Sequence, residues 1–419
     1  MKTNFVTKKW IEVALINFCV VALAGVTMRY KINFSLPAVN QKYLMYGHSN
    51  FAFVGWVSLA LMTLMVRYLI RNKLETNYKK YRILLITETI SAYGMLVFFS
   101  IQGYDFLSNV FTILAILVSY TFIYYYWKDL NKVQENSYAK LWFKGGLVLW
   151  AISSLGAILL AYLLANNIRI QDLYFAGMYF FLHFQYNGWF LFVCFGIFFA
   201  YLERLGLTQV RPPSYSLFLI MIITVLPAFF LSILWLKLPA FLYWTANISG
   251  VLQLVVLIYF IKILRMVMRS SHIKFHKSTN WLWTMASIAF ILKIVLQLLS
   301  IIPSLSAFAF GYRPIIIGYL HLSFVGIISL FIFGYINEFI HRFRGRVSGA
   351  GVLIFVSGFI FQELILLFQG LEAMNVQPVK SANILLFWCV ILQAAGLLWI
   401  TRGIMMAKDE EVGMTPRIS

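Results

Sequence analysis

The sequence predicts an all-α polytopic membrane protein, and both its composition and its long apolar runs support this. Of the 419 residues, 62% are hydrophobic and only 11% are charged, whereas soluble domains carry about 25% charged residues. Apolar runs of roughly 20 residues, each long enough to cross a bilayer as a helix, recur along the whole chain. These features exclude a disordered, collagenous or disulfide-stapled chain and indicate a lipid bilayer as its environment.

Hydropathy predicts twelve transmembrane helices. Twelve spans of roughly 22 residues occupy about 260 positions, so the connections are short and no separate soluble domain fits. We therefore expect a single membrane domain over residues 1–419. In chain order the expected spans are 10–28, 44–70, 82–101, 105–127, 141–165, 173–202, 215–236, 240–267, 279–302, 313–340, 348–370 and 382–405.

Alternate connections between these spans are rich in Lys and Arg. The rich set is Lys2, Lys8, Lys9, Arg71, Lys73, Lys79, Lys80, Arg82, Lys128, Lys132, Lys140, Arg265, Arg269, Lys274, Lys277, Arg342, Arg344 and Arg346. The opposite connections hold fewer, namely Arg29, Lys31, Lys42, Arg169, Lys237, Arg313 and Lys380. Basic loops stay on the cytoplasmic side, so we expect both termini in the cytoplasm and the chain in a bacterial inner membrane. The net charge of +20 is thus a topology signal, and no nucleic-acid module accompanies it.

The three cysteines give no sign of a covalent cofactor. Cys19, Cys194 and Cys389 all fall inside apolar segments and form no CxxC pattern. This argues against a c-type haem, an iron–sulfur cluster or a thiolate copper centre.

Three histidines recur at a fixed interval. His48 opens GHSNFAFVGW, His183 opens HFQYNGWF and His321 opens HLSFVGII, at separations of 135 and 138 residues. Each interval contains four spans, which restores the original orientation, so the units are parallel repeats. We therefore expect three pseudo-symmetric four-helix arcs, at approximately 10–127, 141–267 and 279–405.

The three histidines are expected at one depth. His183 and His321 lie about eight to ten residues into their helices, which is some 12–15 Å from the outer end. An imidazole in hydrocarbon is costly and marks a functional site, although an interhelical hydrogen bond explains a single one. Three at one depth favour a haem or metal site. His272, His276 and His341 fall in basic cytoplasmic connections and are expected to be solvated or to face lipid headgroups.

At these residues the chain resembles the subunit I superfamily of haem–copper oxidases. That family has twelve helices in three arcs. His48-Ser49-Asn50 is similar to a His-Thr-Asn segment of helix two in two of its branches. Helix ten of one branch carries His-x-His followed five residues later by Gly. Tyr319-Leu320-His321 with Gly326 is similar to that pattern, with Tyr319 in place of the first His. The resemblance implies that His48 and His321 are the axial ligands of a low-spin, b-type haem.

The chain departs from that family at the oxygen-reducing centre. The expected seventh span, 215–236, contains no His, so only His183 remains of the copper ligands and copper there stays an open alternative. Tyr319 stands where the high-spin haem ligand belongs, and it either ligates a second haem or packs against a neighbour. The resemblance thus implies a divergent relative without a standard oxygen-reducing copper site. A second resemblance, to the NnrS-like family, rests on size alone because its His-x-His-Glu segment is absent.

Three ionisable residues fall inside the expected spans. Lys293 and Glu363 lie in the middle of theirs, and Glu88 lies in the cytoplasmic half of its own. They are candidates for a proton path, for the coupling groups of an ion-driven carrier, or, for Lys293 and Glu363, for a buried ion pair.

These observations leave several functions open. The first is a membrane haem protein in electron transfer or in the response to O2 or NO, a possible oxidoreductase component with an electron-donor or partner membrane subunit. The alternatives are a twelve-helix ion-coupled secondary transporter and a cofactor-free structural subunit of a membrane complex. The four-helix repeat favours the first, because most transporters of this size consist of two six-helix halves.

Overall fold

The computed structural model describes residues 7–133, 137–271, 273–340, 349–373 and 381–406, and the regular structure in these ranges is entirely helical. The helices are α1 Thr7–Asn33, α2 Gln41–Phe51, η1 Ala52–Ser58, α3 Leu59–Arg71, α4 Lys79–Gln102, α5 Phe106–Asn131, α6 Ala139–Ala165, α7 Gln171–His183, η2 Phe184–Phe190, α8 Leu191–Arg204, η3 Thr208–Val210, α9 Arg211–Val225, η4 Pro227–Ile233, α10 Ala240–Arg269, α11 Lys277–Leu299, α12 Pro303–Gly311, α13 Arg313–His321, η5 Leu322–Ser329, α14 Leu330–Ile340, α15 Gly349–Ala373 and α16 Ser381–Met405. The all-α prediction is confirmed over these ranges.

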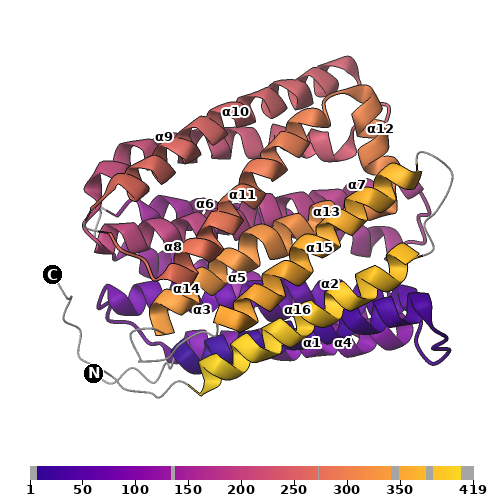
Figure 1. Cartoon of the computed structure of the whole chain (residues 1–419), viewed down its shortest axis with the longest axis horizontal. Coiled ribbons are helices and arrows are strands. Elements are labelled where there is room, and N and C mark those ends of the chain that lie inside the picture. The colour runs from indigo at the N-terminus through magenta and orange to yellow at the C-terminus, as the bar shows by residue number, and fades with distance from the viewer. Residues whose placement is uncertain (1–6, 134–136, 272, 341–348, 374–380, 407–419) are drawn as a thin grey trace.

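The helices form a bundle of membrane-spanning length (Figure 1). Within the described residues, eleven helices are long and apolar enough to cross a bilayer, and a bent pair raises the number to twelve. The prediction of a polytopic helical membrane protein is confirmed at this level. Spans lie where hydropathy placed them, with ends that differ by a few residues.

The seventh span departs from the prediction of one helix over 215–236. The structure has α9 and η4 instead, bent by 49° at a break before Pro227. Proline has no backbone N–H and its ring clashes with the carbonyl one turn earlier, so a helix kinks or stops there. The break leaves backbone carbonyls at the end of α9 in need of other partners.

The first and last helices lie antiparallel against each other. The Sγ atom of Cys19 lies 3.4 Å from the Oγ1 atom of Thr401, and Asn33 donates to the carbonyl of Asn383 at 3.1 Å. As a result, α1 begins and α16 ends at the same end of the bundle (Figure 1). A chain with an even number of spans begins and ends on the same side of the membrane. That this side is the cytoplasm stays a prediction.

Three helices change from α- to π-helical hydrogen bonding in their middle. These are α2–η1–α3, α7–η2–α8 and α13–η5–α14. His183 and His321 directly precede their π segments, and His48 precedes its own by four residues. Such segments are rare and frequently occur at functional sites.

Hydrogen bonds and aromatic rings join the three π segments. Trp189 of η2 donates to Ser58 of η1 at 3.4 Å, and Trp56 of η1 donates to Ser329 of η5 at 3.0 Å. One ring from each segment packs in a common cluster, formed by Phe53, Phe190 and Phe324 with centroid separations of 4.7 to 6.3 Å. The centre of the bundle is therefore the meeting point of the helices that carry the three histidines.

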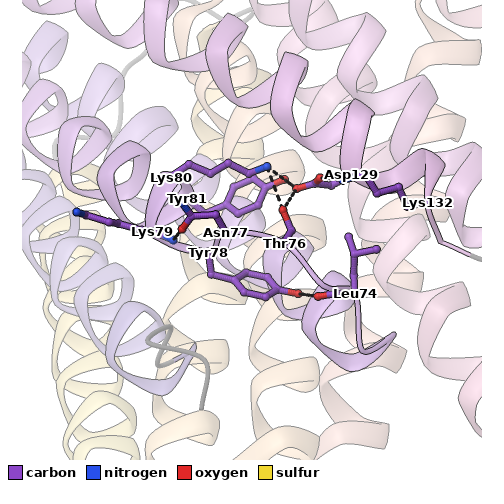
Figure 2. A network of polar contacts seen from close by, with 9 residues as sticks. All are labelled: Leu74, Thr76, Asn77, Tyr78, Lys79, Lys80, Tyr81, Asp129 and Lys132. Carbon is purple, nitrogen blue, oxygen red and sulfur yellow. Dashed lines mark hydrogen bonds and ion pairs between the residues drawn. The ribbon is translucent and has the colours of Figure 1, made fainter. Parts of the chain in front are cut away.

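A buried carboxylate joins α4 and α5 where α4 begins and α5 ends (Figure 2). The Oδ2 atom of Asp129, on α5, accepts hydrogen bonds from Thr76 at 2.8 Å and Tyr81 at 2.9 Å, and it lies 2.6 Å from the Lys80 ammonium. Its Oδ1 atom lies 3.1 Å from the Lys132 ammonium. Both oxygens of this carboxylate thus face donors, which ties the loop before α4 to the end of α5.

Candidate functional site

His48 lies on α2 with its ring against α1. Its Nδ1 atom lies 3.1 Å from the carbonyl oxygen of Val21. A carbonyl only accepts, so Nδ1 carries the proton and Nε2 carries the free lone pair. A Cβ at Gly25 would lie 3.7 Å from the Cε1 atom of His48, so the absent side chain leaves this part of the ring uncovered.

His321 lies at the end of α13, and its Nδ1 atom is buried without a hydrogen-bond partner in the described structure. The carbonyl of Ile317, one turn earlier, is close enough to act on the ring, but the pair lacks the geometry of a hydrogen bond. His48 and Arg29 also act electrostatically on His321. The structure therefore brings together the two histidines that the resemblance pairs, and it adds an arginine.

Arg29 and Arg313 form a pair of like charges beside these histidines. Arg29 lies near the end of α1 and Arg313 begins α13, and the positive charge of Arg313 acts on the Arg29 guanidinium. Arg313 contacts the Sδ atom of Met45 at 3.3 Å. Within the described ranges, no carboxylate lies within ion-pair distance of either guanidinium. Two neighbouring cations without an acidic partner favour an anionic group.

A weak sequence signal for this pair exists. Arg313 precedes His321 by eight residues and Arg29 follows Gly25 by four, so helical spacing places each near the face of its neighbour. By hydropathy alone, both arginines are expected only as charges of the outer connections.

Tyr319 has a partner within the protein. Its ring packs against that of Tyr186 with the two centroids 6.2 Å apart, and the two phenols are close enough to act on each other electrostatically. This contact joins α13 to η2 and corresponds to the packing role that was open for Tyr319 at the sequence level.

His183 has a different environment from the other two histidines. Its Nε2 atom donates to the carbonyl of Val225 at 2.8 Å, and its Nδ1 atom accepts from the Nδ2 atom of Asn187 at 3.1 Å. Both ring nitrogens therefore have protein partners. No group of three or more His, Cys, Asp or Glu side chains suited to a metal ion occurs within the described residues, so the donor set around His183 does not fit a copper ion.

The three buried ionisable residues lie apart from one another. The Lys293 ammonium donates to Gln297 at 3.1 Å. Glu363 on α15 faces α13, where its Oε2 atom would lie 3.4 Å from a Cβ at Gly318. Its Oε1 atom and the Oε2 atom of Glu88 are buried without a hydrogen-bond partner. Over the ranges that the structure describes, Lys293 and Glu363 form no ion pair.

Two cavities lie away from the His48–His321 pair. One of about 40 Å³ is lined by residues of α7, η2, α8, α9, η4, α10 and α11 and has His183 and Lys293 in its wall. The other, of about 310 Å³, lies where α3 and α8 end and includes Arg71, Arg204 and Tyr335.

Of the remaining histidines, the structure describes His276. It precedes α11, where its Nδ1 atom accepts from the backbone N–H of Ser278 at 3.3 Å. His272 and His341 lie outside the described residues, as do Lys2, Lys380, Arg342, Arg344 and Arg346.

No protein-family model matches this chain, and no curated protein matches it.

Proposed function

We propose that this chain is a membrane haem protein that holds one low-spin, b-type haem between His48 and His321. It acts in electron transfer or in the response to O2 or NO, as a possible oxidoreductase component with a partner electron donor. The observation that carries the proposal is a cluster of two imidazoles and two arginines. His48 and Arg29 both lie close enough to His321 to act on it electrostatically, and Arg313 lies close enough to Arg29 to do the same.

The chemistry of these four side chains fits a haem. Two neutral imidazoles are a suitable axial pair for a low-spin iron, and the Nδ1 atom of His48 is already held by the Val21 carbonyl, which leaves Nε2 free to ligate. The two guanidinium groups supply the cations that the two propionates of a haem require. When bound, the haem supplies one-electron transfer at its iron.

The repeat of the three histidines supports the same proposal. Each precedes a π-helical segment. The three segments are joined by hydrogen bonds from tryptophan to serine and by packing of phenylalanine rings. We propose that they are the inner helices of three pseudo-symmetric four-helix arcs. Copper is not part of the proposal, because both ring nitrogens of His183 have partners.

The test is a reduced-minus-oxidised visible spectrum of detergent-purified protein from its own host, with iron analysis of the same sample. We expect sharp α and Soret bands with about one iron per chain. His48→Ala and His321→Ala should each abolish these bands, while His183→Ala should leave them. Loss of the bands in His183→Ala alone would show that the assignment across the repeats is wrong.

A second candidate, an ion-coupled secondary transporter, is favoured by one observation. The break between α9 and η4 lies beside His183 and Lys293, and broken helices beside polar groups are typical of transport sites. Wild-type protein without iron or bands would favour this candidate and overturn the haem.

A further inference from the structure

The 40 Å³ cavity lies within the membrane-spanning part of the bundle and has a polar wall. Its polar lining residues are His183, Asn187, Thr224, Gln253, Lys293 and Gln297, and the others are apolar. None of the lining residues is Asp or Glu. The wall therefore contains one amine and no group that can carry a negative charge.

Lys293 is the residue that requires a partner in this cavity. It is 4% exposed, and its Nζ atom donates one hydrogen bond, to the Oε1 atom of Gln297 at 3.1 Å. An ammonium has three N–H donors, and its burial without an opposite charge costs several kcal/mol. No carboxylate lies within ion-pair distance of Lys293 in the described part of the chain.

His183 cannot satisfy the lysine. Its Nε2–H is committed to the Val225 carbonyl, so Nδ1 must accept, and the amide of Asn187 at 3.1 Å, with the hydroxyl of Ser232 at 3.5 Å, provides the donor. This fixes the orientation of Asn187 and leaves its Oδ1 atom buried without a hydrogen-bond partner. Two residues of the cavity wall, Lys293 and Asn187, thus each keep hydrogen-bonding capacity that the protein does not use.

We propose that this cavity binds one small monovalent anion on the Lys293 ammonium, with a water molecule that donates to Asn187. A volume of about 40 Å³ is roughly three times the space that one water-sized probe occupies. It has room for chloride, nitrite or formate. The amides of Gln253 and Gln297 lie in the same wall and can orient an anion by hydrogen bonds. The site does not involve His48 or His321, so it is independent of the haem.

The test is thermal unfolding of the detergent-purified full chain in sodium gluconate, titrated with chloride, nitrite or formate at constant ionic strength. We expect a saturable rise in Tm of a few degrees, because a ligand that binds only the folded state stabilises it. Lys293→Met should abolish the rise. Lys262→Met, on α10, removes the same charge from an exposed position and should retain it.

Two further results keep the proposal falsifiable if Lys293→Met does not fold. Gln253→Glu places a carboxylate in the cavity wall and should remove the anion dependence while Lys293 is retained. The visible spectrum should not change during the titration, since a change would assign the anion to the haem iron. Equal Tm values in gluconate and in the small anions would overturn the proposal. They would indicate that Lys293 is a neutral amine and that the cavity contains water.

Discussion

The Nε2 atom of His183 lies 2.8 Å from the carbonyl oxygen of Val225, two residues before Pro227 breaks the seventh span. The break deprives this carbonyl of a helical N–H, and the imidazole supplies the missing donor. A buried carbonyl without a donor costs about 1–3 kcal/mol, so the histidine stabilises a kink that proline imposes.

His183→Leu should therefore lower the free energy of unfolding by about 1–3 kcal/mol, and His183→Gln should recover part of the loss through its amide N–H. Thermal unfolding in detergent measures both. The haem bands should persist in each variant. Equal stability of His183→Leu and wild type would contradict a structural role for this hydrogen bond.

Asp129 should be the most sensitive residue at the other end of the bundle (Figure 2). Its side chain is 1% exposed and faces Lys80 and Lys132. Removal of one partner from a buried ion pair costs about 3–5 kcal/mol, and we expect the lower end for Asp129→Ala because both lysines can reach water. Lys132→Ala is the control: its side chain is 49% exposed, so we expect a loss below about 1 kcal/mol. Equal losses in the two variants would contradict this account.

Tyr78 should make stability depend on alkaline pH. Burial, and then the carboxylate of Asp129, raise the pKa of Tyr78 to about 12, against about 10 for an unperturbed tyrosine. Between these values the unfolded chain loses the proton while the folded chain keeps it, so stability falls as pH rises from 10 to 12. Tyr78→Phe should flatten this part of the stability curve, and Tyr124→Phe, at an exposed site, should not.

Hydropathy predicted the positions of the helices because every span that crosses a bilayer must be mostly apolar along its length. The summed hydropathy of about 20 consecutive residues detects this property. It did not predict the broken seventh span, since Pro227 and the residues around it are themselves apolar enough for a continuous helix. The π segments were also hidden. They change the hydrogen-bond register of single turns and leave the composition as it was.

Spacing predicts equivalent places for His48, His183 and His321, since a repeat of four helices restores the orientation of the chain. The pairing of His48 with His321 as haem ligands comes from the family resemblance and stays a prediction. Arg29 and Arg313 could not be recognised in the same way. An arginine near a helix end is interpreted as a loop charge, and only the folded structure shows that these two charges lie near each other. The partners of His183 were equally inaccessible, because they depend on where α9 stops.

Gly156 on α6 should tolerate no side chain. A Cβ at this position would lie 2.6 Å from the backbone nitrogen of Phe181 and 2.7 Å from the carbonyl oxygen of Gly177, both on α7. Alanine favours a helix over glycine by about 1 kcal/mol, but overpacking against backbone costs about 1–3 kcal/mol. We expect Gly156→Ala to lower Tm, whereas Gly311→Ala, with no atom within 4 Å of its Cβ, should not. A rise in Tm for Gly156→Ala would show that the two helices can separate freely.

The Arg29–Arg313 pair gives the most direct test of how the haem is oriented. Replacement of either arginine by glutamine removes a positive charge beside the proposed propionates, which favours the ferric state and should lower the reduction potential. A unit charge at about 10 Å contributes about 1–2 kcal/mol at an effective dielectric constant near 20, which corresponds to tens of millivolts for one electron. A redox titration of the α band measures the shift. Arg169→Gln, at an exposed position in another outer connection, is the matched control. Without a carboxylate between them, Arg29 and Arg313 repel each other, so in haem-free protein the same substitutions should raise Tm. Unchanged potentials in Arg29→Gln and Arg313→Gln would place the propionates elsewhere.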